Sequence, residues 1–213
     1  MIRFCITYVK VNSLDKETSN FRCNTLFIYT EIDMVKLETD RLIIRDQIES
    51  DLIDLHRLWS DKETMYYLED IITNSIDESA EHLKIGIANA AGHYFCICEK
   101  STGIVMGCIG MTITDKTPLG DIVHMGYMLL PEYHGHGYMT EAVKKVIEYA
   151  FTKENYIRIT TGCIKSHVAS WRIMEKVGFR KEGEPIKAQY NDGVMKDRVE
   201  YAINKDEFLN GLI

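Results

Sequence analysis

The sequence of 213 residues has no apolar run approaching the roughly 18–20 residues needed to span a membrane. Its first residues also lack the apolar core and small-residue cleavage site typical of a secretory signal. Basic residues are not in excess, because 25 lysines and arginines oppose 32 aspartates and glutamates, for a net charge of −7. This balance argues against general nucleic-acid binding. We therefore expect a cytoplasmic globular protein with no membrane or nucleic-acid partner. Its charge mildly favours a cationic small molecule or basic protein segment as partner, or it merely aids solubility.

The cysteines do not form a CxxC pair, which is the usual sign of a redox or zinc motif. Cys96 and Cys98 lie two residues apart in a predicted strand, so both side chains should point to the same face. We expect reduced, buried thiols rather than disulfides. The six cysteines are Cys5, Cys23, Cys96, Cys98, Cys108 and Cys163.

Residues 1–33 differ in character from the rest of the chain. They join two apolar fragments, FCITYV and LFIYT, through the polar stretch NSLDKETSN. Met34 then opens MVKLETDRLIIRD, which has the character of a domain start. We expect residues 34–213 to form one domain and residues 1–33 to form a loosely attached extension. Two alternatives stay open for residues 1–33: an extra edge strand, since TLFIYT is β-prone, or a segment upstream of a true start at Met34.

The first half of the domain predicts one strand and then helices. The segment RLIIRD alternates well enough for a strand. Apolar residues from Leu52 to Trp59 recur at helical spacing. Further helices are expected at about 62–68 and 77–90, with Gly92 ending the second.

The second half predicts a meander followed by alternating helices and strands. Three strands, HYFCICEK, GIVMGCIGMTI and DIVHMGYMLL, are separated by short turns, which predicts antiparallel pairing. A strongly amphipathic helix should cover 140–152. A strand YIRITTGCI, a helix HVASWRIMEKV ending at Gly178, and two strands GFRKEG and DRVEYAI linked by an Asn-Asp-Gly turn complete the order. The fold class is mixed α+β.

A glycine-containing loop connects the third meander strand to the 140–152 helix. The strand ends at Leu130, and Pro131 stops the hydrogen-bond ladder because it has no N–H. Gly135 and Gly137 allow the backbone to curl so that several N–H groups point to one side. The helix N-terminus adds a positive dipole end, and Thr140 adds a hydroxyl donor or a cap. Together these features predict an anion site, most naturally for a pyrophosphate.

Two histidines in the same loop raise the alternative of a metal site. His134 and His136 are two residues apart, and a loop could turn both toward one ion. A stable site needs three or four ligands with supporting contacts, and no other cluster supplies them by spacing. We therefore expect no metal, and expect both histidines to flank a backbone-built phosphate cradle.

Four separate segments carry a resemblance to a known family. The loop LLPEYHGHGYMTEA resembles the acetyl-CoA signature of the GNAT acetyltransferase superfamily, where a [QR]-x-x-G-x-[GA] loop holds the CoA pyrophosphate. More narrowly, the chain resembles the RimJ/RimL type, the ribosomal-protein N-terminal acetyltransferases. The similarity covers about 36–208 and also includes LETDRLIIRDQIESDLIDLHRLWSDKETMYYL, HVASWRIMEKVGFRKEG and YNDGVMKDRVEYAI. Glu132, His134 and His167 depart from the usual residues of that pattern.

The resemblance implies a GNAT fold, with a mostly antiparallel sheet of six or seven strands that is splayed in the middle and flanked by helices. The pantetheine arm of acetyl-CoA would lie in the splay and pair with backbone near Leu129 and Leu130, at an open strand edge. His167 stands where an asparagine usually bonds the arm. The residues expected to bind the cofactor are therefore Leu129, Leu130, His134, Gly135, His136, Gly137, Tyr138, Met139, Thr140, His167 and Ser170.

Acetyl transfer to an amine needs a base for the ammonium and an acid for the departing thiolate. The resemblance points to Ser170 as the acid, and Met174 replaces the tyrosine that many members use. Gln189 stands where some members have a glutamate base, and it cannot accept a proton at neutral pH. His124, on the strand leading to the loop, is the alternative base, since an unperturbed histidine pKa of about 6.5 suits this role. A water chain or capture of neutral amine stays open.

The predicted function is transfer of acetyl from acetyl-CoA to a primary amine by direct attack in a ternary complex. The acceptor would be a protein N-terminus or a small amine, and the protein a monomer or homodimer. The alternatives are a CoA-binding sensor with little catalysis, suggested by Gln189 and Met174, and a metal-binding protein using His134 and His136.

Overall fold

The protein is described here from a computed structural model covering residues 2–14, 21–68, 71–88 and 91–211, with side chains from residue 34 onward. The chain divides into two compact units, Met1–Val35 and Lys36–Ile213. In the first unit, strand β1 (Ile2–Leu14) pairs antiparallel with β2 (Phe21–Asp33) in a two-stranded sheet of their own. The described side chains begin at residue 34 and therefore do not include those of Cys5 and Cys23.

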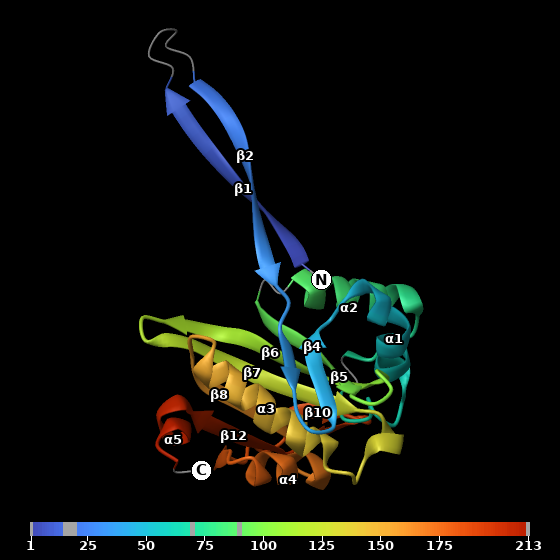
Figure 1. Ribbon diagram of the computed structural model, residues 1–213. Helices are drawn as coiled ribbons and strands as arrows, with labels where there is room; N and C mark the ends of the chain where they lie inside the picture. The colour runs from blue at the N-terminus through green and yellow to red at the C-terminus, as the bar shows by residue number, and fades with distance from the viewer. Residues whose placement is uncertain (1, 15–20, 69–70, 89–90, 212–213) are drawn as a thin grey trace. The chain divides into compact units, whose positions relative to one another are not determined.

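The second unit is built on a sheet in the order β3-β4-β5-β6-β7-β8-β12-β9 (Figure 1). All neighbours pair antiparallel except β7 and β8, which are parallel, so the predicted meander and the mostly antiparallel α+β fold are confirmed. The sheet has eight strands rather than six or seven, one of them the short edge strand β3. The strands are β3 (Lys36–Glu38), β4 (Leu42–Asp46), β5 (Gly92–Glu99), β6 (Val105–Thr117), β7 (Gly120–Leu129), β8 (Tyr156–Ile164), β9 (Arg180–Gly183) and β12 (Arg198–Asn204).

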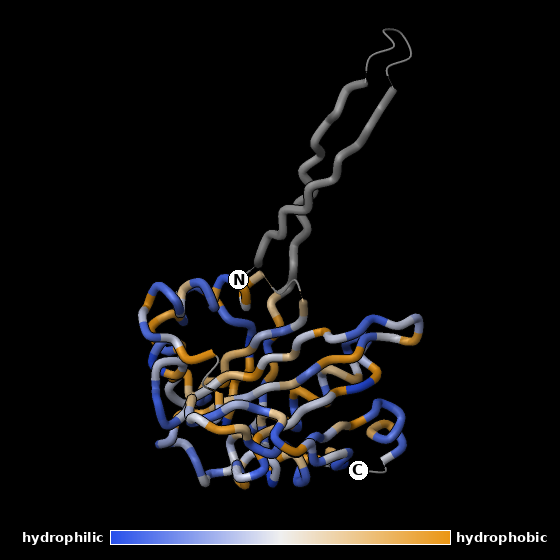
Figure 2. The backbone as a smooth tube through the Cα atoms, turned by 180° about the vertical axis from the view of Figure 1, so that it is seen from behind, coloured by the Kyte–Doolittle hydropathy of each residue, from blue (hydrophilic) through white to orange (hydrophobic). Residues whose placement is uncertain are grey.

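Helices cover both faces of this sheet. On β5, Cys96 and Cys98 join an apolar cluster with α1 and α2, which confirms that they share a face. On the opposite face, the Phe95 ring lies 6.0 Å from that of Tyr149 in α3. Figure 2 shows hydrophobic stretches along the central strands and hydrophilic stretches in the surrounding loops. The helices are η1 (Glu49–Asp51), α1 (Leu52–Ser60), α2 (Ile76–Ala88), η3 (Pro131–Tyr133), α3 (Tyr138–Thr152), α4 (Val168–Lys176) and α5 (Lys205–Leu209).

Among the described residues, no helix is both long and apolar enough to cross a membrane. The thiols of Cys96, Cys98, Cys108 and Cys163 are free and buried, as expected. Burial raises the pKa of the Cys96 thiol well above its usual value, so this side chain stays a neutral, apolar group.

The predicted helix at about 62–68 is wrong, because residues 62–67 form successive turns. The Asp61 carboxylate accepts the Thr64 N–H at 2.7 Å, which closes a local turn. The carbonyls of Tyr66 and Tyr67 accept hydrogen bonds from Asn191 and Gln189 instead of bonding within a helix. Distant partners thus compete successfully with local helix formation.

The Asn-Asp-Gly turn also serves a different pair of strands from the one predicted. It joins β10 (Gln189–Asn191) to β11 (Val194–Lys196), a small two-stranded sheet inserted between β9 and β12. Asp192 has a φ of 51° and Gly193 a φ of 75°, the left-handed backbone that such turns require. The strands β9 and β12 are present and pair with each other, as two last strands were expected to.

The parting of β7 from β8 shapes the ligand-binding region. Their pairing runs from Asp121 with Tyr156 to His124 with Thr160 and then stops. Strand β7 continues to Leu129 against β6, while β8 continues to Ile164 against β12. The two strands therefore diverge, and the predicted splay is confirmed.

Candidate active site

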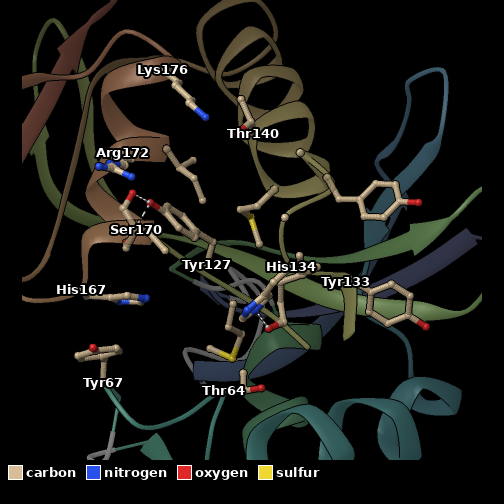
Figure 3. A pocket seen from close by; sticks show the side chains of 18 of the residues that line it. Thr64, Tyr67, Tyr127, Tyr133, His134, Thr140, His167, Ser170, Arg172 and Lys176 are labelled. Carbon is tan, nitrogen blue, oxygen red and sulfur yellow. Dashed lines mark hydrogen bonds between the residues drawn. The ribbon is translucent and has the colours of Figure 1, made fainter. Parts of the chain in front are cut away.

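A pocket of about 640 Å³ lies between the N-terminal end of α3, helix α4 and the loop after α1 (Figure 3). Nine of the predicted cofactor-binding residues line it: Leu129, His134, Gly135, Gly137, Tyr138, Met139, Thr140, His167 and Ser170. The expected Leu130 and His136 do not line it, and neither does His124. Residues that lie far apart in the sequence therefore meet in one cavity.

The glycine loop presents a row of backbone donors to this pocket. Gly135 and Gly137 have φ values of 79° and 80°, so both adopt the left-handed conformation that other residues avoid. Helix α3 begins at Tyr138, slightly before the predicted Thr140, and its first backbone bond runs from the Glu141 N–H to the Gly137 carbonyl. Within the described part of the chain, the N–H groups of residues 135–140 find no acceptor. Such a curled row at a helix N-terminus suits a phosphate group.

The open edge of β7 lies at Tyr127 and Leu129 rather than at Leu130. The Met128 carbonyl faces Gly107 on β6, so the alternating backbone turns the groups of Tyr127 and Leu129 toward the opening. The Leu130 N–H donates to the Met106 carbonyl at 2.9 Å, because it too faces β6. Leu130 is therefore held by the sheet, which explains why it does not line the pocket.

The two loop histidines have different roles in the structure. His134 Nε2 lies 2.8 Å from the Leu129 carbonyl, which pins the loop to the end of β7. His136 is exposed, and its carbonyl accepts a bond from Arg41 at 3.0 Å. The described residues contain no group of three or more His, Cys, Asp or Glu side chains that could hold a metal ion.

Two cations on α4 mark one end of the pocket. Arg172 and Lys176 are four residues apart, so they share one face of the helix, and both line the cavity beside Thr140 (Figure 3). Neither residue was predicted from the sequence to bind a ligand. Their i, i+4 spacing was visible, but only the packing of α4 against α3 shows that they face the same cavity as the loop N–H groups.

Two hydroxyl groups line the pocket where β7 meets α4. Ser170 is buried, and its Oγ lies 3.2 Å from the Tyr127 hydroxyl. The Tyr127 hydroxyl donates to the Ser170 carbonyl at 3.0 Å. Burial raises the pKa of Tyr127, so this phenol stays protonated at neutral pH. The Ser170 hydroxyl can therefore donate either to the Tyr127 oxygen or into the pocket.

His167 closes the lower part of the pocket against the loop after α1. Its ring stacks on Tyr67 with centroids 4.0 Å apart and planes 12° from parallel. Burial, with a smaller contribution from the nearby His134, lowers the pKa of His167 to about 4. The ring is therefore neutral at pH 7.

His124 lies where β7 and β8 begin to part. Its Nδ1 is 3.3 Å from the Thr160 hydroxyl, and its side chain is exposed. Partial desolvation, assisted by the positive charge of Arg198 and opposed by Glu200, lowers the pKa of His124 below 6.5. The imidazole is therefore mostly neutral at pH 7 and able to accept a proton.

The loop after α1 and the β10–β11 sheet stand next to each other at the pocket. Gln189 donates to the Tyr67 carbonyl at 3.1 Å and accepts a bond from Arg198, so it is fully engaged in structural contacts. Tyr127 lines the pocket, whereas Tyr190 on β10 is exposed.

Comparisons with known proteins agree with this geometry. Residues 41–180 match a family model described as an acetyltransferase (GNAT) domain. The chain is similar to the uncharacterised N-acetyltransferase YoaA of Bacillus subtilis, with 31% identity covering 79% of this chain and 96% of the relative. Its fold is similar to a spermidine N-acetyltransferase from Vibrio cholerae in complex with CoA and spermine, with a TM-score of 0.72 and 20% identity over 81% of this chain and 100% of that one. It is also similar to RimL, a ribosomal L7/L12 alpha-N-protein acetyltransferase in complex with CoA, with a TM-score of 0.72 and 19% identity over 80% and 98%.

The low pKa of His167 predicts a stability loss in acid. The unfolded chain binds this proton near pH 6.5 and the folded chain only near 4, so stability falls as the pH drops through this interval. The variant His167→Asn should lose less stability than wild type between pH 7 and pH 4, by roughly 2–3 kcal/mol. Urea unfolding at each pH measures the difference. Equal pH dependence in the two proteins would contradict the assignment.

Proposed function

We propose, from the premise that this chain belongs to the GNAT acetyltransferase superfamily and is an N-acetyltransferase, that it moves an acetyl group from acetyl-CoA to a primary amine. The two substrates would be bound together, and the amine would attack the thioester directly. The observation that carries this proposal is the row of N–H groups at residues 135–140, which have no acceptor within the described chain and belong to a segment that, apart from His136, lines the pocket beside the splay. We further infer a RimJ/RimL-type enzyme in the cytoplasm, with residues 34–213 as its catalytic domain, supported by the four sequence motifs and the compact unit Lys36–Ile213.

The residues present fit CoA along its length. The loop N–H groups and the Thr140 hydroxyl would hold the pyrophosphate, with Arg172 and Lys176 supplying positive charge nearby. The backbone of Tyr127 and the N–H of Leu129 would pair with the amides of the pantetheine arm. His134, Tyr138, Met139 and His167 would line the walls. When bound, acetyl-CoA supplies an activated acetyl group whose carbonyl the amine can reach.

Ser170 is the proposed acid for the thiolate. Its hydroxyl is buried in the pocket wall next to the protonated phenol of Tyr127. A serine held in this way can give its proton to the departing thiolate and then regain one from water. Met174 occupies the position of the more usual tyrosine and is buried in the core, so it offers no hydroxyl for this step.

His124 is the proposed base, acting on the ammonium through water because its side chain does not line the pocket. Its lowered pKa keeps the imidazole neutral and ready to accept a proton at pH 7. Orientation of two bound substrates supplies much of the remaining acceleration, up to about 7–11 kcal/mol in the best-oriented cases.

The acceptor class is the finer part of the proposal. A protein N-terminus and a small polyamine both present a primary amine, and the similar solved proteins are named for one or the other. The test is release of free thiol from acetyl-CoA over a panel of ribosomal N-terminal peptides, polyamines, aminoglycosides and amino acids. Turnover with one class identifies the acceptor. CoA binding without any turnover would favour a sensor instead.

Replacing Gly135 should abolish CoA binding and spare the fold. A Cβ atom at position 135 would meet no atom within 4 Å, so we expect the Gly135→Leu side chain to be accommodated by the protein and to obstruct the phosphates. The matched control is Gly103→Leu, which has a φ of 77°, compared with 79° for Gly135, and equally open surroundings in the β5–β6 turn. Both variants should lose about 1 kcal/mol of stability from the left-handed backbone. Only Gly135→Leu should lose CoA affinity in isothermal titration, and equal affinity in both would refute the loop assignment.

The base assignment predicts a specific pH profile. In wild type, kcat/KM should fall on the acid side with an apparent pKa below 6.5, because His124 must be neutral to accept the proton. His124→Ala should lower kcat by about 10²-fold and remove that acid limb. The profile is measured by thiol release with the acceptor found in the panel. An unchanged profile would remove His124 from the mechanism.

A further inference from the structure

Arg41 lies against the glycine loop although it stands far from it in the sequence. Its Nη1 donates to the His136 carbonyl at 3.0 Å, and its Nε donates to the Glu141 carboxylate at 2.8 Å. Its guanidinium carbon lies 4.4 Å from the centre of the Tyr138 ring. One side chain therefore contacts three points along the segment where the loop becomes helix α3.

The Glu141 carboxylate is itself held from several directions. One oxygen accepts the Thr39 hydroxyl at 2.6 Å, and the Arg41 N–H lies 3.3 Å from the same oxygen. The other oxygen pairs with the Arg41 guanidinium at 2.6 Å. Partial burial raises the pKa of Glu141, but the bonds from Thr39 and Arg41 outweigh it and leave that pKa below its usual value. The carboxylate thus stays ionised and keeps Arg41 in a single orientation.

The bond to the His136 carbonyl decides where the next N–H points. A trans peptide is planar, with its C=O and N–H on opposite sides. Because the His136 carbonyl is turned toward Arg41, the Gly137 N–H is turned away from it. Gly137 lines the pocket assigned to CoA, whereas Arg41 lies outside that lining, in a smaller cavity on the other side of Tyr138.

We propose that Arg41 is a positioning residue for binding of the CoA diphosphate. It fixes the orientation of the peptide between His136 and Gly137 before the cofactor binds. This inference rests on the proposed function. A loop with two left-handed glycines has many accessible conformations, and ordering it on binding weakens affinity. The Arg41 contacts fix the loop in advance, and Arg41 does not itself line the pocket assigned to CoA. Arg41 therefore affects the diphosphate part of the cofactor and not the arm.

The test compares ligands with and without the diphosphate. In Arg41→Met, CoA affinity by isothermal titration should fall about tenfold, the effect of losing one hydrogen bond to a charged group. Binding of pantetheine, which has the arm but no diphosphate, should stay unchanged in ligand-observed NMR. Arg41→Lys should behave like Arg41→Met, because an ammonium cannot bond the His136 carbonyl and Glu141 in the same fork.

A matched variant separates this effect from a general loss of charge or stability. Arg180→Met removes an exposed arginine that pairs with Glu207 away from the pocket, and it should bind CoA like wild type. Unchanged CoA affinity in Arg41→Met, or an equal loss for pantetheine, would overturn the positioning role. A wild-type protein that binds no CoA would instead overturn the proposed function. If Arg41→Met does not fold, Arg41→Lys gives the same comparison.

Discussion

The structure depends on one interruption in hydrogen bonding, where β7 stops pairing with β8 beyond His124 and Thr160. A closed sheet would satisfy the backbone of β7 on both edges and leave no space for a ligand. Because the strands diverge, the Tyr127 and Leu129 edge stays open and the N-terminal ends of α3 and α4 reach the opening. Strand β7 stays paired with β6, and β8 stays paired with β12. The divergence therefore removes hydrogen bonds from only one edge of each strand.

The pocket is held together by contacts between distant parts of the chain. On the loop side, Arg41 reaches His136 and Glu141. On the opposite side, Gln189 and Asn191 bind the carbonyls of Tyr67 and Tyr66. These bonds give hydrogen-bond partners to backbone carbonyls that are not bonded within a helix or strand. They also hold the glycine loop and the loop after α1 in place. The walls of the pocket therefore depend on the folded sheet rather than on their own local preferences.

The charge at one end of the pocket is opposite in sign to the net charge of the chain. The chain is acidic overall, with a net charge of −7, yet Arg172, Lys176 and the N-terminus of α3 make one end of the pocket positive. Away from that end, the pocket is lined by the protonated Tyr127, by the neutral His167, whose pKa is lowered to about 4, and by the acidic side chain of Glu63. Positive charge confined to one end of a pocket suits a ligand that is anionic at that end only. The composition alone could not reveal this arrangement.

The sequence by itself determined the main helices and strands of the sheet and the glycine loop. Strong periodicity identified α3 and the meander strands, and Gly135 and Gly137 marked a loop where the backbone must turn left-handed. Local patterns suffice there because the signal lies within a few residues. Only the tertiary structure decided the turns at 62–67, the position of the β10–β11 sheet, the exclusion of Leu130 from the pocket, and the roles of Arg41, Arg172 and Lys176. Each of these depends on hydrogen bonds or packing between residues far apart in the chain, which no local pattern encodes.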